Sequence, residues 1–322
     1  MSRLAVLMAR NTFPDTARYL GEHFDVEAND RPVDWPRDEL IRRLQGKAGV
    51  LVAGTEPIDA SLVEACPDLR AVCSMAVGYN NIDIAACAAR GVVVTNAPDV
   101  LTETTADFGF ALMMAAARRI AEGEHFLRAG HWQRWSYDML VGADVHGATL
   151  GILGMGRIGQ AIARRGALGF GMPVIYHNRS RLAPELEAPL AARWVSKDDL
   201  LRQADHLVIV LPYSGASHHA IGAAELALMQ PSATLTNIAR GGVVDDAALS
   251  QALAERRIAA AGLDVFEGEP QLHPALLSLP NVVLTPHIAS ATVATRLRMA
   301  TLAADNLIAV LGGRPPRTPV RA

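Results

Sequence analysis

The chain of 322 residues has little cysteine, no excess of either charge and no long apolar run. Its three cysteines lack CxxC spacing, so we expect buried free thiols at Cys66, Cys73 and Cys87. The 30 basic and 33 acidic residues give a net charge of -3, which argues against nucleic acid and membrane surfaces as partners. The longest apolar stretch, residues 108–117, is far short of the ~20 residues that a membrane span needs.

The amino-terminal segment MSRLAVLMARNTFPD holds only a short apolar run with no cleavage-site pattern, so we expect a cytoplasmic protein without a secretory signal. HxxxH and HxxE spacings and clustered acids do not occur, so no metal is expected. Half of the residues are hydrophobic and a fifth are charged, which excludes a disordered chain. The length predicts about two domains.

Short apolar runs alternate with helical segments through the first hundred residues, which predicts a parallel sheet covered by helices. Asp59 and Asn81 are candidate helix N-caps. The expected strands are residues 4–8, 49–53, 70–74 and 92–95, and the expected helices are residues 36–45, 59–65 and 81–90.

A long helix is predicted over residues 102–128, with a centre that is apolar on every side. Such a helix is buried all round, beneath its domain or against a second subunit. Residues 131–147 are expected to form a loop. A second alternating series then follows, with strands at residues 149–153, 173–176, 206–211, 234–238, 259–264 and 282–284 and a last helix at residues 292–311.

The sequence LGILGMGRIGQ places G-x-G-x-x-G directly after a strand and at the start of a helix. The first glycine permits a tight turn, the second lets the backbone approach a pyrophosphate, and the third lets helix and strand pack closely. The helix N-terminus adds N–H groups and a positive dipole end. A dinucleotide site is therefore predicted at Gly154, Met155, Gly156, Arg157, Ile158 and Gly159.

The end of the next strand, YHNRSR, indicates which dinucleotide is bound. NAD enzymes place an acidic residue about 20 residues after the glycine motif, on the ribose 2′-hydroxyl. Here Asn178 occupies that place, Arg179 and Ser180 follow, and the first carboxylate is Glu185. We expect Asn178, Arg179 and Ser180 to bind a 2′-phosphate, so that NADP is preferred and NAD is possible. The alternative is a solvated basic turn.

Six segments together resemble the D-isomer-specific 2-hydroxyacid dehydrogenases over nearly the whole chain. The tryptophan loop and the YHNRS strand end are most similar to the branch of glyoxylate/hydroxypyruvate reductases and 2-ketogluconate reductases. The six segments are MAVGYNNID (75–83), NAPDVLTETTADFGFALMMAAARR (96–119), LGILGMGRIGQAIARR (150–165), NIARGGVVDDAAL (237–249), AAGLDVFEGEP (260–270) and TPHIASAT (285–292).

The resemblance implies that Arg240, Glu269 and His287 are catalytic. The chemistry is consistent with this, because a guanidinium holds a carboxylate with two hydrogen bonds and a histidine beside a carboxylate can protonate an alkoxide. The resemblance further implies main-chain substrate contacts at Val77 and Gly78, nicotinamide-side contacts at Leu211, Pro212, Ile238 and Asp264, and a substrate contact at Trp135. Asp264 could equally be an N-cap or a turn residue.

The expected fold is α/β, with a Rossmann-type cofactor domain at about residues 97–287 and a flavodoxin-like substrate domain. The resemblance implies a substrate domain made of residues 1–96 plus the returning C-terminal helix, residues 288–322, with the active site in the cleft between the domains. The expected assembly is a homodimer with the 108–117 helix at the interface, where Trp135 either reaches the partner's active site or packs locally.

The expected activity is NADPH-dependent reduction of a short 2-keto acid such as glyoxylate or hydroxypyruvate, with 2-ketogluconate next. One alternative is NAD-linked oxidation of another D-2-hydroxy acid, such as 3-phosphoglycerate or D-lactate. The other is a non-catalytic dinucleotide-sensing binding protein, as in the C-terminal-binding-protein corepressors, which share the fold.

Overall fold

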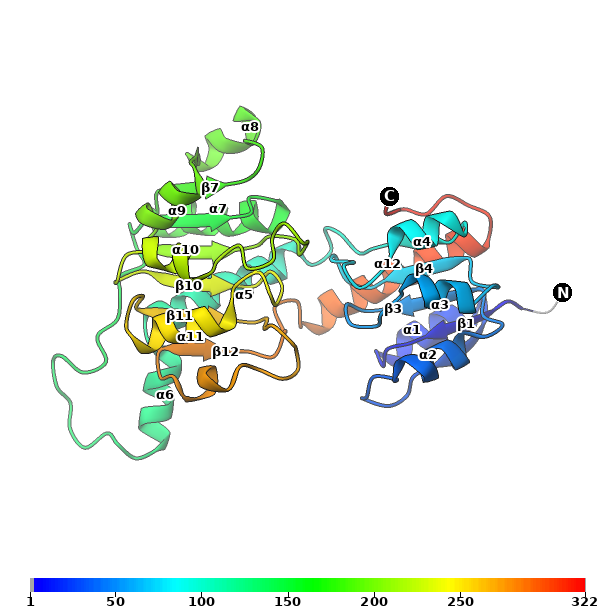
Figure 1. The fold of residues 1–322 in the computed structure, drawn as a ribbon, viewed down its shortest axis with the longest axis horizontal. Coiled ribbons are helices and arrows are strands. Elements are labelled where there is room, and N and C mark those ends of the chain that lie inside the picture. Colours follow the sequence, from blue (N-terminus) through cyan, green and yellow to red (C-terminus); the bar gives the residue numbers. More distant parts are fainter. Residues whose placement is uncertain (1–2, 322) are drawn as a thin grey trace. The chain divides into compact units, whose positions relative to one another are not determined.

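The computed structural model describes residues 3–321, which form two compact units (Figure 1). The first unit holds residues 3–101 together with 291–321, and the second holds residues 102–290. Each unit contains one sheet in which all strand pairs are parallel, so the predicted α/β fold is confirmed.

The first unit has a five-stranded sheet in the order β2-β1-β3-β4-β5, which is the flavodoxin-like order. Its strands are β1 (Ala5–Met8), β2 (Asp25–Ala28), β3 (Gly49–Val52), β4 (Ala71–Ser74) and β5 (Val93–Thr95). Its helices are α1 (Pro14–Gly21), α2 (Arg37–Leu44), α3 (Ala60–Ala65), α4 (Ile84–Ala89) and α12 (Val293–Leu311).

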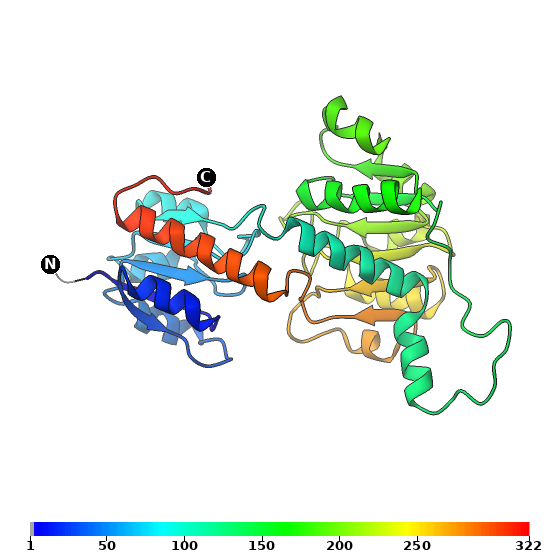
Figure 2. The same ribbon diagram turned by 180° about the vertical axis from the view of Figure 1, so that it is seen from behind.

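Helices cover both faces of this sheet. Helices α1 and α12 pack on one face, where Leu20 and Leu307 share a core cluster with Val6 and Leu51 of the strands (Figure 2). Residues of α2, α3 and α4 form the second core cluster with the strands. The chain after residue 290 therefore completes the first unit, because α12 packs beside α1 and buries the rest of that face.

The second unit has a seven-stranded sheet in the order β12-β11-β10-β9-β6-β7-β8. Its strands are β6 (Leu150–Leu153), β7 (Val174–His177), β8 (Arg193–Trp194), β9 (His206–Ile209), β10 (Thr234–Asn237), β11 (Ala260–Leu263) and β12 (Val282–Leu284). Its helical segments are α5 (Thr102–Ala117), α6 (Ile120–Arg128), α7 (Arg157–Phe170), α8 (Pro184–Glu187), α9 (Lys197–Gln203), α10 (Ala223–Leu228) and α11 (Asp246–Ala254), with 3-10 turns at Ala188–Leu190 and Pro274–Ser278.

The strand order reverses direction between β6 and β9. From β6 the chain runs outward through β7 to β8, and then returns to β9 and runs outward the other way to β12. Helices α5 and α7 pack on one face of the sheet, and α9, α10 and α11 pack on the other (Figures 1 and 2). In sheets of this kind ligands bind outside the carboxyl ends of the strands at such a reversal, because neighbouring loops diverge there.

The single helix expected over residues 102–128 is wrong, because the chain breaks between α5 and α6. Arg119 lies in the left-handed region at φ 53°, and α6 begins directly after it. The break accommodates the returning loop: the N–H of Ala143 donates to the carbonyl of Ala117 at 2.9 Å. A Cβ at Gly142 would lie 2.4 Å from that carbonyl oxygen, so the loop passes close against the end of α5.

Several local expectations can be compared directly with the structure. Asp59 caps α3 as predicted, but Asp83 rather than Asn81 caps α4. The thiols of Cys66, Cys73 and Cys87 are buried and free, which confirms that prediction. Residues 131–147 contain neither helix nor strand, as expected. Among the described residues, every helix is too short or too polar to cross a bilayer.

Candidate active site

Three neighbouring strands of the second unit carry the residues expected to be catalytic. Strands β10, β11 and β12 are parallel and adjacent, so their carboxyl ends lie at the same edge of the sheet. Arg240 follows β10, Glu269 lies in the loop after β11, and His287 follows β12. The fold therefore brings together three side chains that are distant in sequence.

His287 and Glu269 form a hydrogen-bonded pair, with 2.9 Å between Nδ1 and Oε2. The other carboxylate oxygen of Glu269 accepts from the main-chain N–H of Phe266 at 2.8 Å. Burial raises the pKa of Glu269, but the hydrogen bonds from His287 and Phe266 and the charges of His287 and Arg240 bring that pKa below its ordinary value. The bond at Nδ1 leaves Nε2 of His287 available for a substrate oxygen.

The backbone of His287 is held in an uncommon conformation by Asp264. His287 lies in the left-handed region at φ 55°, and its N–H donates to the carbonyl of Asp264 at 2.9 Å. The buried carboxylate of Asp264 accepts from the main-chain N–H groups of Ile288 and Ala289, each at 2.8 Å, and from Oγ1 of Thr285 at 2.7 Å. A non-glycine residue keeps such a conformation only where its surroundings fix it.

These contacts favour the turn role for Asp264, which the sequence left open. A carboxylate accepts about four hydrogen bonds, and three of those sites are used by residues 285–289. The predicted contact of Asp264 with a nicotinamide carboxamide stays a prediction, with one acceptor site remaining for it.

Arg240 is a half-buried cation without a carboxylate partner among residues 3–321. Its Nη1 donates to the carbonyl of Ala239 at 2.8 Å, and burial lowers the pKa of its guanidinium, although the charge of Glu269 opposes that effect. A cation that is partly removed from water is costly unless an anion compensates it. The arrangement is therefore suited to an anionic ligand.

The loop after Arg240 can approach the loop that holds Glu269 because residue 241 is glycine. A Cβ at Gly241 would lie 1.7 Å from the carbonyl oxygen of Phe266, and Gly242 has φ 77°. Glycine at residue 241 thus lets two main-chain segments touch. This contact keeps Arg240 and Glu269 in one small region of the sheet edge.

The predicted glycine motif joins β6 to α7. Gly154 has φ 106°, and a Cβ there would lie 2.8 Å from the carbonyl of Val210. A Cβ at Gly159 would lie 2.4 Å from the carbonyl oxygen of Gly154. A Cβ at Gly156 would project into open space, at the start of a helix that has no side-chain cap.

Asn178 contacts this motif from the end of β7. Its Oδ1 accepts from the N–H of Met155 at 2.7 Å. A main-chain N–H can only donate, so the amide oxygen faces Met155 and the amide NH₂ is left to donate elsewhere. Arg179 and Ser180 are exposed. Arg181 forms a bidentate ion pair with the buried Glu187, so its guanidinium already has a partner within the protein.

For the other predicted site residues the structure gives burial and neighbours, but no contact that bears on their predicted roles. Leu211 is half-buried, and its main chain lies against Gly154; Pro212 is exposed. The buried side chain of Ile238 packs in the core against Gly109 of α5. Trp135 is 68% exposed, with its nearest aromatic contact at Tyr137.

Arg157 is exposed and Ile158 is half-buried at the start of α7. Val77 and Gly78 lie in the first unit, in the loop after β4, and both are half-exposed. The roles predicted for all of these residues stay predictions.

Asp246, which sequence reasoning missed, holds the main chain of the loop that carries Glu269. The carboxylate of Asp246 accepts from the N–H of Glu267 at 2.9 Å, and burial raises the pKa of Asp246. Asp246 follows Asp245, which caps α11. Paired aspartates at a helix start suggest a cap, and nothing in the sequence shows that the second one points toward a loop 21 residues away.

Residues 110–289 match the family model for the NAD-binding domain of D-isomer specific 2-hydroxyacid dehydrogenases. The glyoxylate reductase of Thermococcus onnurineus is 46% identical over 317 residues, which are 97% of this chain and 94% of that enzyme. A solved structure from Thermus thermophilus is similar at a TM-score of 0.92 and 41% identity, over 98% of this chain and 100% of its own. The NADPH-dependent glyoxylate/hydroxypyruvate reductase of Sinorhizobium meliloti, solved with NADP and malonate, has a TM-score of 0.88 and 37% identity, over 99% of this chain and 97% of its own.

Proposed function

The chain belongs to the D-isomer specific 2-hydroxyacid dehydrogenases, which are NAD(P)-dependent enzymes, and from that premise we propose that it reduces glyoxylate or hydroxypyruvate with NADPH. The product is the corresponding 2-hydroxy acid, of D configuration where the carbon is chiral. Relatives that are named glyoxylate reductase and a similar reductase solved with NADP support this substrate and this cofactor.

The observation that carries the proposal is the half-buried Arg240 beside the His287–Glu269 pair. A 2-keto acid has a carboxylate next to a carbonyl, so a guanidinium and a proton donor are what its reduction needs. The guanidinium can hold the carboxylate through two parallel hydrogen bonds, which a lysine cannot match. The imidazolium then stands ready to protonate the neighbouring oxygen.

The chain's own residues account for the proton in this reaction. The nicotinamide cofactor, when bound, supplies the hydride. As the carbonyl carbon gains that hydride, its oxygen gains negative charge, and Nε2 of His287 donates a proton to it. Glu269 holds Nδ1 of His287 and so orients the ring, which leaves Nε2 as the proton donor. Asp264 keeps the histidine backbone in place.

The residues around α7 fit a dinucleotide. The uncapped helix start offers main-chain N–H groups and the positive end of the helix dipole to a pyrophosphate. The open space at Gly156 allows phosphate oxygens to approach the backbone. The amide NH₂ of Asn178 and the cation of Arg179 provide donors for a 2′-phosphate.

A panel of 2-keto acids assayed with both cofactors tests the proposal. We expect the highest kcat/KM for glyoxylate or hydroxypyruvate with NADPH, with 2-ketogluconate below them. Higher kcat/KM for oxidation of D-lactate or D-3-phosphoglycerate with NAD would identify another dehydrogenase of the family. Dinucleotide binding without turnover of any acid would identify a binding protein.

We also infer a homodimer that buries one side of α5. In the described chain this helix is not buried all round: Ala111 is exposed, and Phe108, Met114 and Ala115 are half-buried. A shallow apolar hollow lies between Phe110 and Met114 of α5 and Phe170 of α7. Two copies related by a two-fold axis would cover this surface.

Sedimentation at micromolar concentration should show the dimer, and Ala111→Arg should shift it toward monomer because a charge would enter the interface. Ala254→Arg is a matched control, since Ala254 is an exposed alanine at the end of α11, on the opposite face of the sheet. A wild-type chain that sediments as a monomer would rule out the dimer, and with it any role of Trp135 in a partner's active site.

A further inference from the structure

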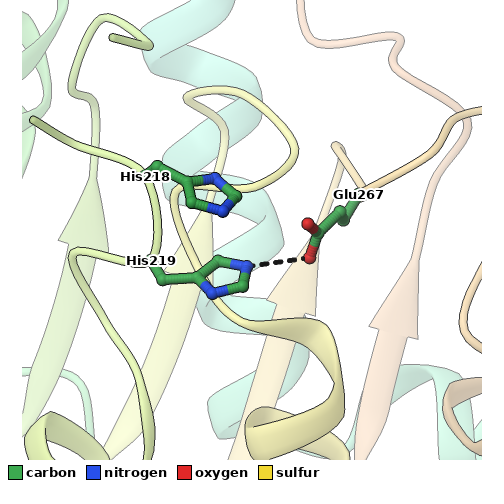
Figure 3. Close-up of side chains that lie close together, drawn as sticks. All are labelled: His218, His219 and Glu267. Atoms are coloured by element: carbon green, nitrogen blue, oxygen red, sulfur yellow. Dashed lines mark hydrogen bonds and ion pairs between the residues drawn. The ribbon is translucent and has the colours of Figure 1, made fainter. Parts of the chain in front are cut away.

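Three side chains of types that can ligate a metal lie together outside the residues assigned to the reaction: His218, His219 and Glu267 (Figure 3). The two histidines come from the loop after β9, and Glu267 comes from the loop after β11. One ligand atom of each side chain lies within 4.8 Å of the others, and Nε2 of His219 is 3.0 Å from Oε2 of Glu267. His219 and Glu267 are 48 residues apart in the sequence, so a search for short metal-binding motifs does not find this cluster.

The Nδ1 atom of each imidazole, which faces away from the cluster, already has a polar neighbour. The hydroxyl of Tyr213 lies 3.2 Å from Nδ1 of His218, and Oδ2 of Asp245 lies 3.8 Å from Nδ1 of His219. Metal-binding histidines usually have the second ring nitrogen hydrogen-bonded, which fixes the ring and its tautomer; Nδ1 of His218 meets this condition, whereas Asp245 lies beyond hydrogen-bond distance of His219. The Nε2 atoms are then the ones left to meet a metal together with Glu267.

The backbone holds both histidines close together. His219 lies in the left-handed region at φ 49°, and its N–H donates to the carbonyl of Gly242 at 2.7 Å. The two imidazole rings stack with their centroids 3.9 Å apart. A Cβ at Gly242 would lie 3.3 Å from Nδ1 of His218 and 3.1 Å from the ring of Tyr213, so the glycine allows this packing. Non-glycine residues in this conformation gather at functional sites.

We propose that His218, His219 and Glu267 bind a divalent first-row transition metal of the zinc type. Two imidazoles and one carboxylate form a donor set that such ions accept with water as a fourth ligand. The side chains of His219 and Glu267 are 37% and 43% exposed, which leaves room for that water and for small rotations of the rings. Asp245 adds a second carboxylate and favours a dication.

Titration calorimetry with Zn²⁺ on the full chain, after removal of metals with EDTA, tests the site. The variants are His218→Ala and Glu267→Gln, each of which removes one ligand. His125→Ala is the matched control, because His125 is an exposed imidazole on α6 that lies 3.8 Å from a carboxylate of Glu124. The measurement contains neither cofactor nor keto acid, so its outcome does not depend on the reductase activity.

The wild-type protein and His125→Ala should bind one equivalent of Zn²⁺ with the same affinity. His218→Ala and Glu267→Gln should each weaken that binding at least about tenfold, since loss of even an outer-sphere partner costs 10–100-fold. Equal affinity in all four proteins would overturn the proposal, as would the absence of any binding by the wild type. Glu267→Gln alone decides the matter if His218→Ala does not fold, because it is isosteric and its side chain is partly exposed.

Discussion

Replacing His287 with alanine should lower kcat for keto-acid reduction by about 10²–10⁴-fold, the usual contribution of a positioned general acid. The loss follows from the geometry at the end of β12, where Glu269 holds Nδ1 of His287 at 2.9 Å and Nε2 is left to protonate the substrate oxygen. The measurement is steady-state turnover of glyoxylate with saturating NADPH.

His125→Ala serves as the control for loss of an exposed histidine, and thermal unfolding shows whether each variant is folded. A folded His287→Ala protein with nearly wild-type kcat would remove this residue from the mechanism. KM for the keto acid should change less than kcat, because Arg240 rather than His287 is proposed to hold the carboxylate.

Glu269→Gln tests the same pair through pH. Reduction needs the imidazolium, so activity falls as pH rises and the imidazolium loses its proton. Although burial raises it, the pKa of Glu269 is brought below its ordinary value by the hydrogen bonds from His287 and Phe266, so a carboxylate faces the ring in the wild type. With a neutral amide at residue 269, reduction should therefore fail at a lower pH than in the wild type. A pH profile of kcat/KM that stays unchanged would show that Glu269 does not act on the histidine's charge.

The wild-type protein should prefer NADPH over NADH by about 10- to 1000-fold in kcat/KM. A net hydrogen bond to a charged group contributes roughly 1.5–3 kcal/mol, and each 1.4 kcal/mol is about tenfold. One or two contacts from Asn178, Arg179 or Ser180 to the 2′-phosphate would produce that preference. Arg181 should contribute little, because Glu187 already holds it.

The double variant Asn178→Asp with Arg179→Ala should abolish or reverse this preference and leave kcat with saturating NADH largely intact. An aspartate can still accept from the N–H of Met155, so the contact with the glycine motif is kept. It repels a 2′-phosphate, and it accepts from the ribose hydroxyls of NADH. Arg181→Ala is the control. Equal kcat/KM for both cofactors in the wild type would show that Arg179 faces solvent and does not select the cofactor.

The sequence identified the features that recur at strand ends, because those features are local. The glycine motif could be predicted from the strand before it and the helix after it, and Asn178 from its distance along the chain. The break at Arg119 could not be predicted, since it depends on how the distant loop around Gly142 returns to α5.

The hydrogen-bond and ion-pair partners of individual side chains could not be predicted from the sequence either. The N–H of Met155 as donor to Asn178, the capture of Arg181 by Glu187, and the support of the Glu269 loop by Asp246 each join residues from different elements. Their geometry is set by packing, which residue type and spacing do not contain. The contact of Ile238 with the nicotinamide side is implied by the family resemblance and stays a prediction, and the structure adds that its side chain packs in the core.

The three glycines of the predicted dinucleotide motif are constrained in two different ways. At Gly154 and Gly159 a methyl group would collide with the protein's own backbone, so selection for a folded chain alone is enough to keep them. At Gly156 a methyl group would meet no protein atom, so under the proposed function the bound cofactor alone would exclude it. A descendant of this enzyme that lost its dinucleotide could therefore drift at residue 156 while residues 154 and 159 stayed glycine.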